Sequence, residues 1–533
     1  ITLPQHQKEG KTLFDTPIIF APPKETSAPS VTSVPSTYRE FSLGSVIKDI
    51  TDPEVLKDES TPQFQAFRWI VYEDEREVDL SDPLVVVQRY ILATLYFSTG
   101  GNIAWSDKLD FLSPESECKW NRVEPDFSYY GVVCLTFDTV SGISLDSNNL
   151  TGPLPEEVFS LPNLKHLSLS NNAGLSGTIP TRIGEANSLE TFFLRYTKLS
   201  GSIPSSIGLL GKLTYLILSV NALTGSIPSS IGDMLALQAL SLAANNLTNH
   251  IPSSLGKLVQ LTELYLNHNS LSGIIPPNLT KMDNLQVLNV AFNDLTGPIP
   301  SEAWSCQNLR SFNVGENLMT GSIPNAIFAC SHLEYLDFAN NALEGTLPSE
   351  VSSLLGMKHL HLNHNSFTGT IPPQITALSD LRALGGAWNQ FSGSLPAQIG
   401  NFVNLKILFF FNNSLMGTIP ESFSKLTKLE QIDMALNQFS GRLPSFLGKL
   451  SLLFDLRLEY NRFFGTVPQT FDNLKSLYRL GLQGNKLTGD VSFLCDTVTV
   501  MWANCLGPNT EINCTCCQIC CRGNALNDNC EYT

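Results

Sequence analysis

The chain has 533 residues, a formal net charge of −16, 15% charged residues and 42% hydrophobic residues. This apolar content excludes a largely disordered chain. The negative charge disfavours a nucleic-acid partner, because phosphate backbones bind basic surfaces. The longest apolar stretch, residues 84–97, is interrupted by Gln88 and Arg89, and we expect it to be too short to span a bilayer.

Residues 1–60 are predicted to form an extended, linker-like segment, because residues 21–30 are rich in proline, serine and alanine. The chain opens at Ile1 rather than Met, so we expect that a targeting or anchoring segment was removed or left out. Order within residues 1–60 would indicate docking against the rest of the chain or against an assembly partner.

Residues 61–140 are predicted to form a helical cap with paired cysteines. Thr61-Pro62 and Ser81-Asp82-Pro83 are typical helix starts, since each places Pro at the first helical position. The second of these helices is expected to end at Gly100-Gly101, because glycine readily adopts the left-handed conformation that ends helices.

A repeat of the pattern LxxLxLxxNxLxGxIP, with a period of 24, fills residues 141–491. One extra residue after Asn172 makes a single spacing 25. A fixed period of this length is the signature of leucine-rich repeats. The fifteen turns are numbered by their anchor residues, which are Asn148, Asn172, Thr197, Asn221, Asn245, Asn269, Asn293, Asn317, Asn341, Asn365, Asn389, Asn413, Asn437, Asn461 and Asn485.

Each repeat position has a local physical role. The leucines point inward, while Tyr265 and its equivalents alternate outward on a concave strand. The anchor amide, for example that of Asn269, is expected to bond backbone groups that a flat sheet would leave unsatisfied. Thr197 keeps a hydrogen-bonding side chain, and Asn249 replaces a glycine where the backbone is expected to be left-handed. The fold class predicted is an α/β repeat solenoid. It would be a right-handed leucine-rich-repeat superhelix with a parallel concave β-sheet, a helical N-terminal cap and a disulfide-rich C-terminal cap.

The core of the eleventh turn has an unusual residue. Gly386 occupies an inward strand position that leucine fills at Leu362 and other turns. An empty position would leave a destabilising cavity. We therefore expect that Phe410, at the equivalent position of the next turn, packs over Gly386.

Residues 492–533 are predicted to form a cysteine-rich C-terminal cap. After Asn485 the pattern continues through Gly489 but loses its Ile-Pro, and no further strand consensus follows. The exposed apolar end of the last turn would need cover. The residues expected to supply it are Phe493, Leu494, Val498, Val500, Met501 and Trp502, with Cys495 and Cys505 placed to hold the loop.

The 12 cysteines predict an oxidising compartment. Cys306 and Cys330 occupy the same place in adjacent turns; a disulfide is conceivable, but the core position favours two buried thiols. The tail cysteines are interpreted as four disulfides rather than a metal cluster. The residues predicted to form disulfides are Cys118, Cys134, Cys495, Cys505, Cys514, Cys516, Cys517, Cys520, Cys521 and Cys530. The potential N-glycan acceptors are Asn149, Asn246, Asn278, Asn412 and Asn513.

The repeat with Gly-x-Ile-Pro resembles the plant-type leucine-rich repeat of receptor-kinase ectodomains, receptor-like proteins and polygalacturonase-inhibiting proteins. The segment from Cys118 through Trp120 to Cys134 is similar to their N-terminal cap. Residues 89–101 and the cysteine-rich tail resemble secreted or membrane-anchored repeat proteins of diatoms and related algae. The resemblance covers about residues 61–533. It implies an extracellular location, secreted or tethered to the cell surface through a segment not in this chain, and a recognition or scaffold role. Neither a transmembrane helix nor a kinase domain follows the repeats.

The outward positions of the ninth to twelfth turns carry the candidate ligand site. Small residues, Ala383, Gly385 and Ala387, lie between imidazoles on one side and phenyl rings on the other, so a recess is expected. Aromatic rims suit a carbohydrate or peptide partner. The residues predicted to bind it are Tyr335, Asp337, His359, His361, His364, Trp388, Phe409 and Phe411.

Two other functions are weighed against ligand recognition. A zinc site at the histidines of the tenth turn is geometrically imaginable, but no supporting pattern is readable, so no metal or other cofactor is expected. Asp433 and Asp455 could approach each other, but an open curved face does not exclude water, and the outward carboxylates as a whole are scattered over many strands, so no enzyme is predicted. The outward carboxylates are Glu263, Glu316, Asp433, Asp455 and Glu459. A binding module for a glycan or protein is the leading interpretation, and a structural subunit of an extracellular or membrane-associated assembly is the alternative.

Overall fold

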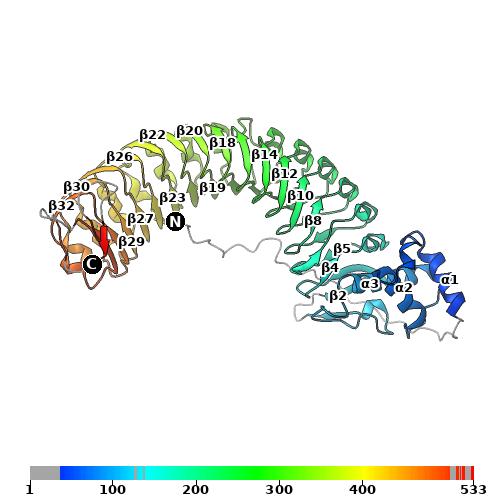
Figure 1. Ribbon diagram of the computed structural model, residues 1–533. Coiled ribbons are helices and arrows are strands. Elements are labelled where there is room, and N and C mark those ends of the chain that lie inside the picture. The colour runs from blue at the N-terminus through cyan, green and yellow to red at the C-terminus, as the bar shows by residue number, and fades with distance from the viewer. Residues whose placement is uncertain are drawn as a thin grey trace. The chain divides into compact units, whose positions relative to one another are not determined.

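A computed structural model of the chain describes residues 36–124, 129–135, 138–504, 512–514, 517, 519–521 and 530–532. Internal contacts divide the chain into two units, Ile1–Leu237 and Gln238–Thr533. Within each unit, Figure 1 shows short strands that lie side by side, turn after turn. Among the helices that the structure describes, none is long and apolar enough to cross a bilayer.

Three helices open the first unit: α1 (Ser36–Ile47), α2 (Pro62–Tyr72) and α3 (Pro83–Ser98). The two predicted helix starts are confirmed. The Thr61 hydroxyl accepts a hydrogen bond from the Phe64 amide at 3.1 Å, and Asp82 accepts one from the Leu84 amide at 3.1 Å. Side-chain caps of this kind satisfy backbone donors that the first helical turn leaves unpaired.

Residues 36–47 form helix α1 rather than part of an extended linker. The helix buries Arg39, Leu43 and Ile47, which are spaced four residues apart and therefore share one face. Helix α1 contacts both α2 and α3 of its own chain. Residues 1–35 of the predicted linker lie outside the described residues.

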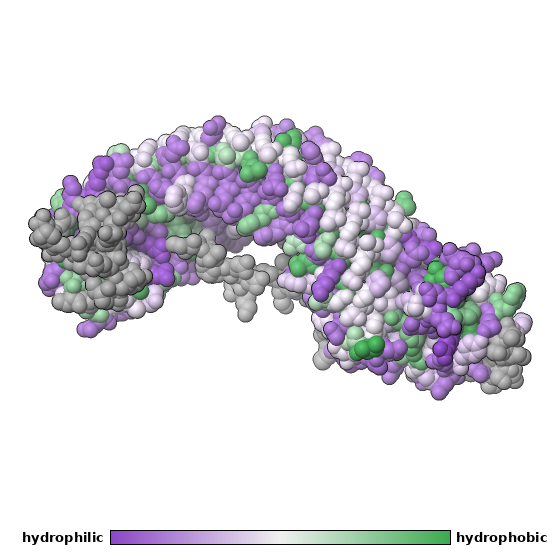
Figure 2. Space-filling view, in the orientation of Figure 1, coloured by the Kyte–Doolittle hydropathy of each residue, from purple (hydrophilic) through white to green (hydrophobic). Residues whose placement is uncertain are grey.

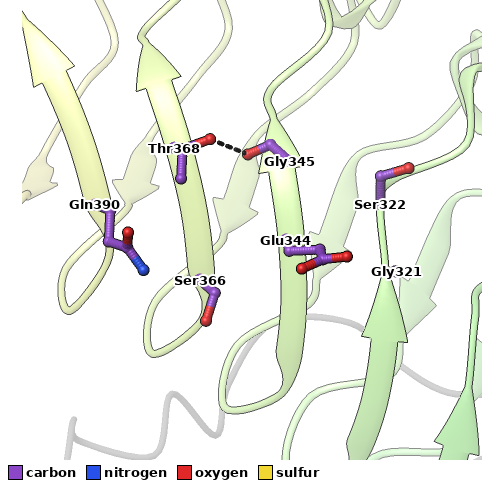
Figure 3. A pocket seen from close by; sticks show the side chains of 7 residues that line it. All are labelled: Gly321, Ser322, Glu344, Gly345, Ser366, Thr368 and Gln390. Atoms are coloured by element: carbon purple, nitrogen blue, oxygen red, sulfur yellow. Dashed lines mark hydrogen bonds between the residues drawn. The ribbon is translucent and has the colours of Figure 1, made fainter.

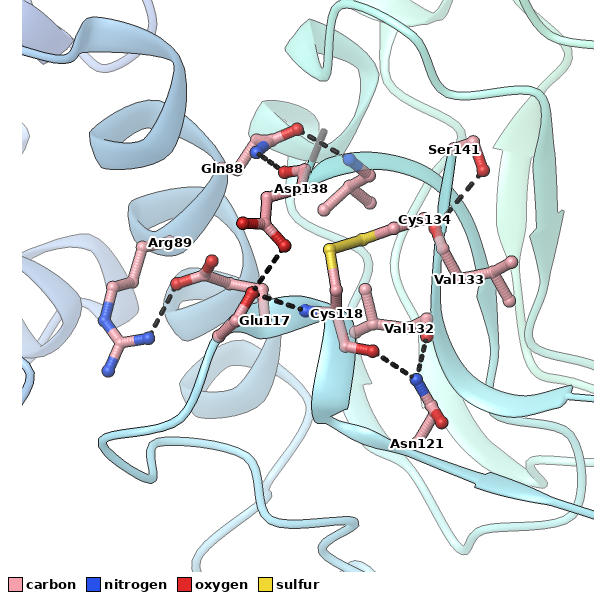
Figure 4. The surroundings of a disulfide bond; sticks show 12 residues. Gln88, Arg89, Glu117, Cys118, Asn121, Val132, Val133, Cys134, Asp138 and Ser141 are labelled. Carbon is pink, nitrogen blue, oxygen red and sulfur yellow. Dashed lines mark hydrogen bonds and ion pairs between the residues drawn. A yellow bond between two sulfur atoms is a disulfide. The ribbon is translucent and has the colours of Figure 1, made fainter. Parts of the chain in front are cut away.

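A buried ion network joins α3 to the loop before it and to the 3₁₀ segment after it, and Figure 4 shows its Arg89 and Glu117 members. Arg89 is fully buried and contacts Asp74 and Glu117, each at 2.6 Å. Its guanidinium carbon lies 4.9 Å from the centre of the Trp69 ring and 5.0 Å from that of Trp120.

The predicted disulfide between Cys118 and Cys134 is confirmed and lies beside this network. It joins the 3₁₀ segment η3 (Glu117–Lys119) to strand β2 (Tyr129–Leu135). The cap is therefore fixed by a disulfide and by buried charges together.

The first unit contains two sets of strands. In the sheet that starts at the cap, β1 and β2 are antiparallel, as are β2 and β3, and the later neighbours are parallel. Its strands are β1 (Asn121–Val123), β2, β3 (Thr139–Ser144), β5 (His166–Ser168), β7 (Thr191–Phe193) and β9 (Tyr215–Ile217). The other set is β4 (Thr151–Pro153), β6 (Gly174–Ser176), β8 (Ser200–Ser202) and β10 (Ala222–Ser226). The 3₁₀ segments are η2 (Val55–Lys57), η3, η4 (Glu156–Ser160), η5 (Thr181–Glu185), η6 (Ser205–Leu209) and η7 (Ser229–Asp233).

The second unit repeats the same turn with parallel neighbours throughout most of its length. One sheet comprises β11 (Ala239–Ser241), β13 (Glu263–Tyr265), β15 (Val287–Asn289), β17 (Ser311–Asn313), β19 (Tyr335–Asp337), β21 (His359–His361), β23 (Ala383–Gly385), β25 (Ile407–Phe409), β27 (Gln431–Asp433), β29 (Asp455–Arg457), β31 (Arg479–Gly481), β33 (Val500–Ala503), β35 (Ile519–Cys521) and β36 (Cys530–Tyr532).

The opposite side of the turns in the second unit carries a second set of short strands, most of which are followed by a 3₁₀ segment. The strands are β12 (Asn246–His250), β14 (Ser270–Gly273), β16 (Asp294–Gly297), β18 (Leu318–Gly321), β20 (Ala342–Thr346), β22 (Ser366–Thr370), β24 (Gln390–Gly393), β26 (Ser414–Gly417), β28 (Gln438–Gly441), β30 (Arg462–Thr466), β32 (Lys486–Asp490) and β34 (Ile512–Asn513). The 3₁₀ segments are η8 (Ser253–Lys257), η9 (Pro277–Lys281), η10 (Asn325–Ala329), η11 (Ser349–Ser353), η12 (Pro373–Ala377), η13 (Ile399–Asn401), η14 (Glu421–Lys425), η15 (Ser445–Lys449), η16 (Gln469–Asn473) and η17 (Ser492–Leu494).

The anchor residues make the predicted backbone hydrogen bonds. The buried Asn437 amide donates to the Phe410 carbonyl at 2.7 Å and to the Met434 carbonyl at 3.2 Å, while its Oδ1 accepts from the Leu415 amide at 2.9 Å. The Thr197 hydroxyl donates to Oδ1 of Asn221. Asn437 therefore ties its own turn to the preceding one, whereas Thr197 is tied to the turn that follows it.

Phe410 packs over Gly386, as predicted. A Cβ on Gly386 would lie 2.4 Å from Cε1 and 2.9 Å from Cδ1 of the Phe410 ring, so the ring occupies the space that a side chain would need. Phe410 is 2% exposed and also contacts Phe391, with 5.9 Å between the ring centres. The small residue in one turn is thus compensated by a large one in the next.

Replacing Phe410 by leucine is expected to lower the free energy of unfolding more than the same change at Phe338. Phe338 is equally buried and holds the same strand position in the ninth turn, next to the filled position of Leu362. The Phe410 change also opens space above Gly386, and residual cavities cost about 24 cal/mol per Å³. We expect a difference of about 1 kcal/mol or more in urea unfolding. Equal losses for the two variants would contradict this expectation.

The prediction of two buried thiols at Cys306 and Cys330 is wrong, because the two residues form a disulfide. Their Cα atoms lie 5.1 Å apart, which is about the spacing of neighbouring strands and within the range that a disulfide bridges. Equivalent positions in adjacent turns therefore bring paired cysteines into bonding range even inside the core.

The sheet continues beyond the fifteenth turn, although no strand consensus follows residue 491. Strand β33 pairs in parallel with β31, β35 pairs with β33, and β36 pairs with β35 in antiparallel fashion. Of the residues expected to cover the last turn, Leu494, Val498 and Met501 are buried. Cover is therefore supplied partly by extra strands and partly by the predicted loop residues.

Disulfides hold the described part of this tail. Cys514 and Cys517 are bonded to each other, and Cys495 is also in a disulfide. Cys505 and Cys516 lie outside the described residues, and of Cys520, Cys521 and Cys530 only the backbone is described. The pairing predicted for these five cysteines stays a prediction.

Candidate functional site

The candidate site lies on the strand face, a name used here for the exposed side of the sheet that runs from β11 to β33 in the second unit. Alternate residues of each strand point to this side, because successive side chains of a strand point in opposite directions. The register places Tyr335 beside His359, and Asp337 beside His361. It also places His359 beside Ala383, and Gly385 beside Phe409. All eight predicted ligand-binding residues therefore belong to four adjacent turns.

The ninth and tenth turns contribute a tyrosine, an aspartate and two histidines. The Tyr335 hydroxyl donates to Oδ2 of Asp337 at 2.9 Å, and the Ala339 amide donates to Oδ1 of the same carboxylate at 2.9 Å. The Tyr335 ring centre lies 5.9 Å from that of His359 and 5.7 Å from that of His361. Burial lowers the pKa of His361 below its usual value, so its imidazole is held in the neutral form.

The tenth to twelfth turns contribute a row of three aromatic rings in contact. The ring of His364 stacks on that of Trp388 with 5.4 Å between centres, and Phe411 meets Trp388 edge to face at 5.3 Å. Trp388 remains 45% exposed. Aromatic side chains with one free face offer a large contact area to a ligand. These rings, with Tyr335, His359 and His361, are called the aromatic group below.

His364 and Trp388 have left-handed backbones, with φ of 52° and 54°. The residue before the anchor is left-handed in every turn of the second unit from Ala244 to Tyr460. Bulky residues rarely adopt this conformation. Here the hydrogen bonds of the anchor residue that follows stabilise the left-handed conformation. This conformation is part of the repeat geometry, and it sets the direction of the Trp388 side chain.

Sequence reasoning missed Asn363, which occupies the floor of the expected recess. A Cβ on Gly385 would lie 2.6 Å from Nδ2 and 2.7 Å from Oδ1 of Asn363. Oδ1 of Asn363 also accepts a hydrogen bond from the Ala387 amide at 2.9 Å. The recess is therefore filled at Gly385 by a carboxamide. The signal available in the sequence was a polar residue followed by a glycine 22 positions later.

A second group of polar residues, the carboxylate cluster, follows on the strand face. Its members are Asp433, Asp455, Arg457 and Glu459. Nε and Nη2 of Arg457 donate to the two oxygens of Asp455 at 3.1 and 3.0 Å, and its Nη1 lies 3.6 Å from Oδ2 of Asp433. The approach of Asp433 and Asp455 is the one that the sequence suggested among its scattered carboxylates. Arg457, which sequence reasoning did not single out, draws two of them together.

Comparison with known proteins identifies these repeats as leucine-rich repeats. The family described as "Leucine-rich repeat region" matches residues 146–345, and the family described as "Leucine Rich Repeat" matches residues 356–378 and 404–426. A segment of 77 residues, 14% of this chain, is 39% identical to the receptor-like protein kinase HSL1 of Arabidopsis thaliana, of which it covers 7%. The fold is a leucine-rich-repeat solenoid.

Solved structures of plant receptors are similar to this leucine-rich-repeat chain. The plant peptide hormone receptor RGFR1 in complex with RGF2 is 31% identical, with a TM-score of 0.65 over 68% of this chain and 59% of that one. A TDR receptor is 30% identical, with a TM-score of 0.65 over 68% and 64%. The ectodomain of the Arabidopsis receptor kinase HAESA, in complex with an IDA peptide hormone ligand, is 25% identical, with a TM-score of 0.52 over 79% and 86%. The chain thus spans less than two thirds of the first two receptors, and its repeats are similar to those of plant receptor ectodomains.

Burial sets the charge state of two residues in the carboxylate cluster. It raises the pKa of Asp433 to about 6 and that of Glu459 to about 7. For both residues the removal of water is the largest cause, because it penalises the ionised form. The folded leucine-rich-repeat chain therefore holds protons on these carboxyls at pH values where an unfolded chain would release them.

Thermal stability is expected to fall as the pH rises from 5 to 8. Because the pKa of each carboxyl is higher in the folded chain, its favourable contribution is complete below about pH 4 and lost as the pH passes the folded values of about 6 and 7. We expect the two residues together to account for roughly 4 kcal/mol over this pH range. Melting curves of the wild type and of the Asp433→Asn, Glu459→Gln double variant measure this. The double variant should show the smaller fall, and identical falls would refute the assignment.

The second set of strands in this unit bears a shallow polar groove, shown in Figure 3. It has a volume of about 730 Å³ and lies across β18, β20, β22 and β24. Glu344, Ser366 and Gln390 line it from neighbouring strands. The groove has no aromatic residue in its lining, so it lacks the contact area that the aromatic group offers.

On the side of the molecule shown in Figure 2, hydrophobic residues are scattered among hydrophilic ones rather than gathered in one large patch.

The structure also bears on metal binding and on the exposure of the potential glycan acceptors. Within the described ranges, no group of three or more His, Cys, Asp or Glu side chains is arranged to hold a metal ion. Of the potential glycan acceptors, Asn149, Asn246, Asn278 and Asn513 are exposed. Asn412 is half-buried and holds the position of Trp388 in the next turn, so a glycan there would border the aromatic group. Glycosylation at these five residues stays a prediction.

Proposed function

We propose that the chain is an extracellular recognition module that binds a peptide or protein ligand on its strand face. The aromatic group is the main observation behind the proposal. Its Trp388 side chain is nearly half exposed, and its ring contacts His364 of the preceding turn and Phe411 of the following turn. Rigid, partly exposed rings of this kind are frequent anchors of protein–ligand interfaces. The similarity to RGFR1 and HAESA ectodomains, each solved with a peptide hormone, supports the same class of ligand.

A scaffold role and a glycan ligand receive less support. The scaffold hypothesis started from order in residues 1–60, and α1 packs on α2 and α3 of its own chain, which accounts for order at residues 36–47 without a neighbouring protein. A pyranose ring could also stack on Trp388. Oligosaccharides therefore belong in the test as competing ligands. The resemblance to algal repeat proteins, secretion and a surface tether remain part of this proposal.

The test uses an array of synthetic peptides and oligosaccharides probed with the full chain and two variants. Trp388→Ala is expected to weaken peptide binding at least tenfold. Phe292→Ala is the matched control, because Phe292 holds the same position four turns earlier, is 46% exposed and stacks on His268 with ring centres 4.1 Å apart. Binding that survives Trp388→Ala, or that is confined to oligosaccharides, would overturn the proposal.

A further inference from the structure

The strand face becomes acidic directly after the aromatic group. Phe409 lies beside Asp433 on the next strand, and Asp433 lies beside Arg457 on the strand after that. Three carboxylates, on Asp433, Asp455 and Glu459, share this surface with the guanidinium groups of Arg457 and Arg479. The surface therefore carries more negative than positive charge when its carboxyls are ionised.

The two arginines are directed mainly to Asp455. Arg457 makes two hydrogen bonds to Asp455, and Nη1 of Arg479 lies 3.7 Å from Oδ2 of Asp455. Asp433 has the longer 3.6 Å contact with Arg457 and accepts the Ala435 amide at 3.1 Å. Positive charge is thus concentrated at one carboxylate, and none of the ion pairs in the described part of the chain involves Glu459.

Glu459 has a buried oxygen without a hydrogen-bond donor. Its carboxylate lies over Gly481, where Oε2 would be 2.1 Å from a Cβ, and Oε2 accepts no hydrogen bond from any described residue. Oε1 of Gln483, at the same position one turn later, is also buried and without a donor in the described chain. Unsatisfied buried acceptors are costly, so two of them in adjacent turns indicate a missing donor.

We propose that the carboxylate cluster binds a cationic group of the ligand, a guanidinium or an ammonium, with Glu459 and Gln483 as its acceptors. Such a group supplies several N–H donors and a positive charge, which are the two things that this end of the strand face lacks. The inference rests on the proposed peptide-binding function and specifies the chemistry of the ligand at one end of the same surface.

The repeat fixes the distance between the aromatic group and the carboxylate cluster. Phe411, Ala435 and Glu459 hold one position in three successive turns. Neighbouring strands are about 4.8 Å apart, so Phe411 and Glu459 are separated by roughly 10 Å. An extended peptide advances about 3.3 Å per residue, so roughly three residues would span this distance. The ligand is therefore expected to carry an apolar or aromatic side chain about three residues from its cationic group.

The probes for this inference are two synthetic tetrapeptides, acetyl-Trp-Gly-Gly-Arg-amide and its twin with citrulline in place of arginine. Citrulline has the same length and a neutral head, so the pair isolates the charge. Binding to the full chain is measured by saturation-transfer NMR at pH 8, where Glu459 is ionised. We expect the arginine peptide to bind about tenfold more tightly than the citrulline peptide.

Two variants localise the effect. Glu459→Gln is expected to abolish the preference for arginine. Glu263→Gln is the matched control, because Glu263 is a buried strand-face carboxylate, also with an oxygen lacking a donor, in the sixth turn, and it should leave the preference unchanged. Melting curves confirm that both variants fold.

The outcomes separate the two proposals. Equal binding of both peptides, lost on Trp388→Ala, overturns the cationic subsite and leaves peptide recognition standing. A preference for arginine that survives Glu459→Gln also overturns the subsite. Binding of neither peptide at millimolar concentration counts against both proposals.

Discussion

Replacing Arg89 by methionine is expected to lower the free energy of unfolding of the N-terminal cap by about 3 to 5 kcal/mol. Arg89 is fully buried, and its guanidinium contacts Asp74 and Glu117. Methionine fills most of the volume but leaves the two carboxylates without their shared cation, although Arg76 still reaches Glu117 at 2.9 Å. A buried charge without a partner is far more costly than the pair was favourable.

Urea unfolding of the full chain, followed by the fluorescence of the cap tryptophans, measures this loss. Arg122→Met is the matched control, because Arg122 also contacts two carboxylates, those of Asp107 and Glu124, but its side chain is 55% exposed. Exposed ion pairs contribute about 1 kcal/mol or less, so this variant should be nearly neutral. Adding Asp74→Asn and Glu117→Gln to Arg89→Met should recover part of the loss. A loss below 1 kcal/mol for Arg89→Met would show that the network is not needed.

The sequence predicts those contacts of the fold in which a residue packs against the residue at the equivalent position of the adjacent turn. The contact between Phe410 and Gly386 is of this kind, because a spacing of 24 residues makes distant positions neighbours. The left-handed backbone of Asn249, with φ of 66°, is another, since the other turns place glycine there. A regular repeat turns tertiary contacts into a sequence pattern.

The same rule was available but not applied to one pair of cysteines, and a related spacing was overlooked. Cys306 and Cys330 are 24 residues apart, and their disulfide follows from that spacing, whereas the general preference of cysteine for cores predicted thiols. Asn363 over Gly385 and Glu459 over Gly481 are each 22 residues apart and repeat one arrangement. At the cysteines a general residue preference was given more weight than the period of the repeat.

The cap could not be predicted in this way, because it does not repeat. Arg89 meets Asp74 and Glu117 through loops whose paths depend on the packing of α2 and α3. Helix α1 carried a usable signal in Leu43 and Ile47, which are four residues apart, but the proline-rich composition upstream suggested an extended segment. Interactions that occur only once need the structure.

Ending the chain after Asp490 is expected to give aggregated protein. The truncation removes β33, which pairs with β31 through Val500, Met501 and Trp502, and so exposes a sheet edge. It also removes the buried side chains of Leu494 and Met501 from the apolar end of the last turn. An exposed edge next to an apolar surface favours association between chains, because both can be covered by another copy.

A chain ending after Asn504 separates the two causes of this effect. It keeps β33 and the buried residues but lacks β35 and the Cys514–Cys517 disulfide. Size-exclusion chromatography should show aggregates for the shorter chain and mainly monomer, with a lower melting temperature, for the longer one. The full chain should be insensitive to EDTA, because the tail cysteines whose side chains are described, Cys495, Cys514 and Cys517, are all in disulfides. A monomeric chain ending after Asp490, or a full chain that loses structure in EDTA, would contradict the interpretation of the tail as a disulfide-held cap.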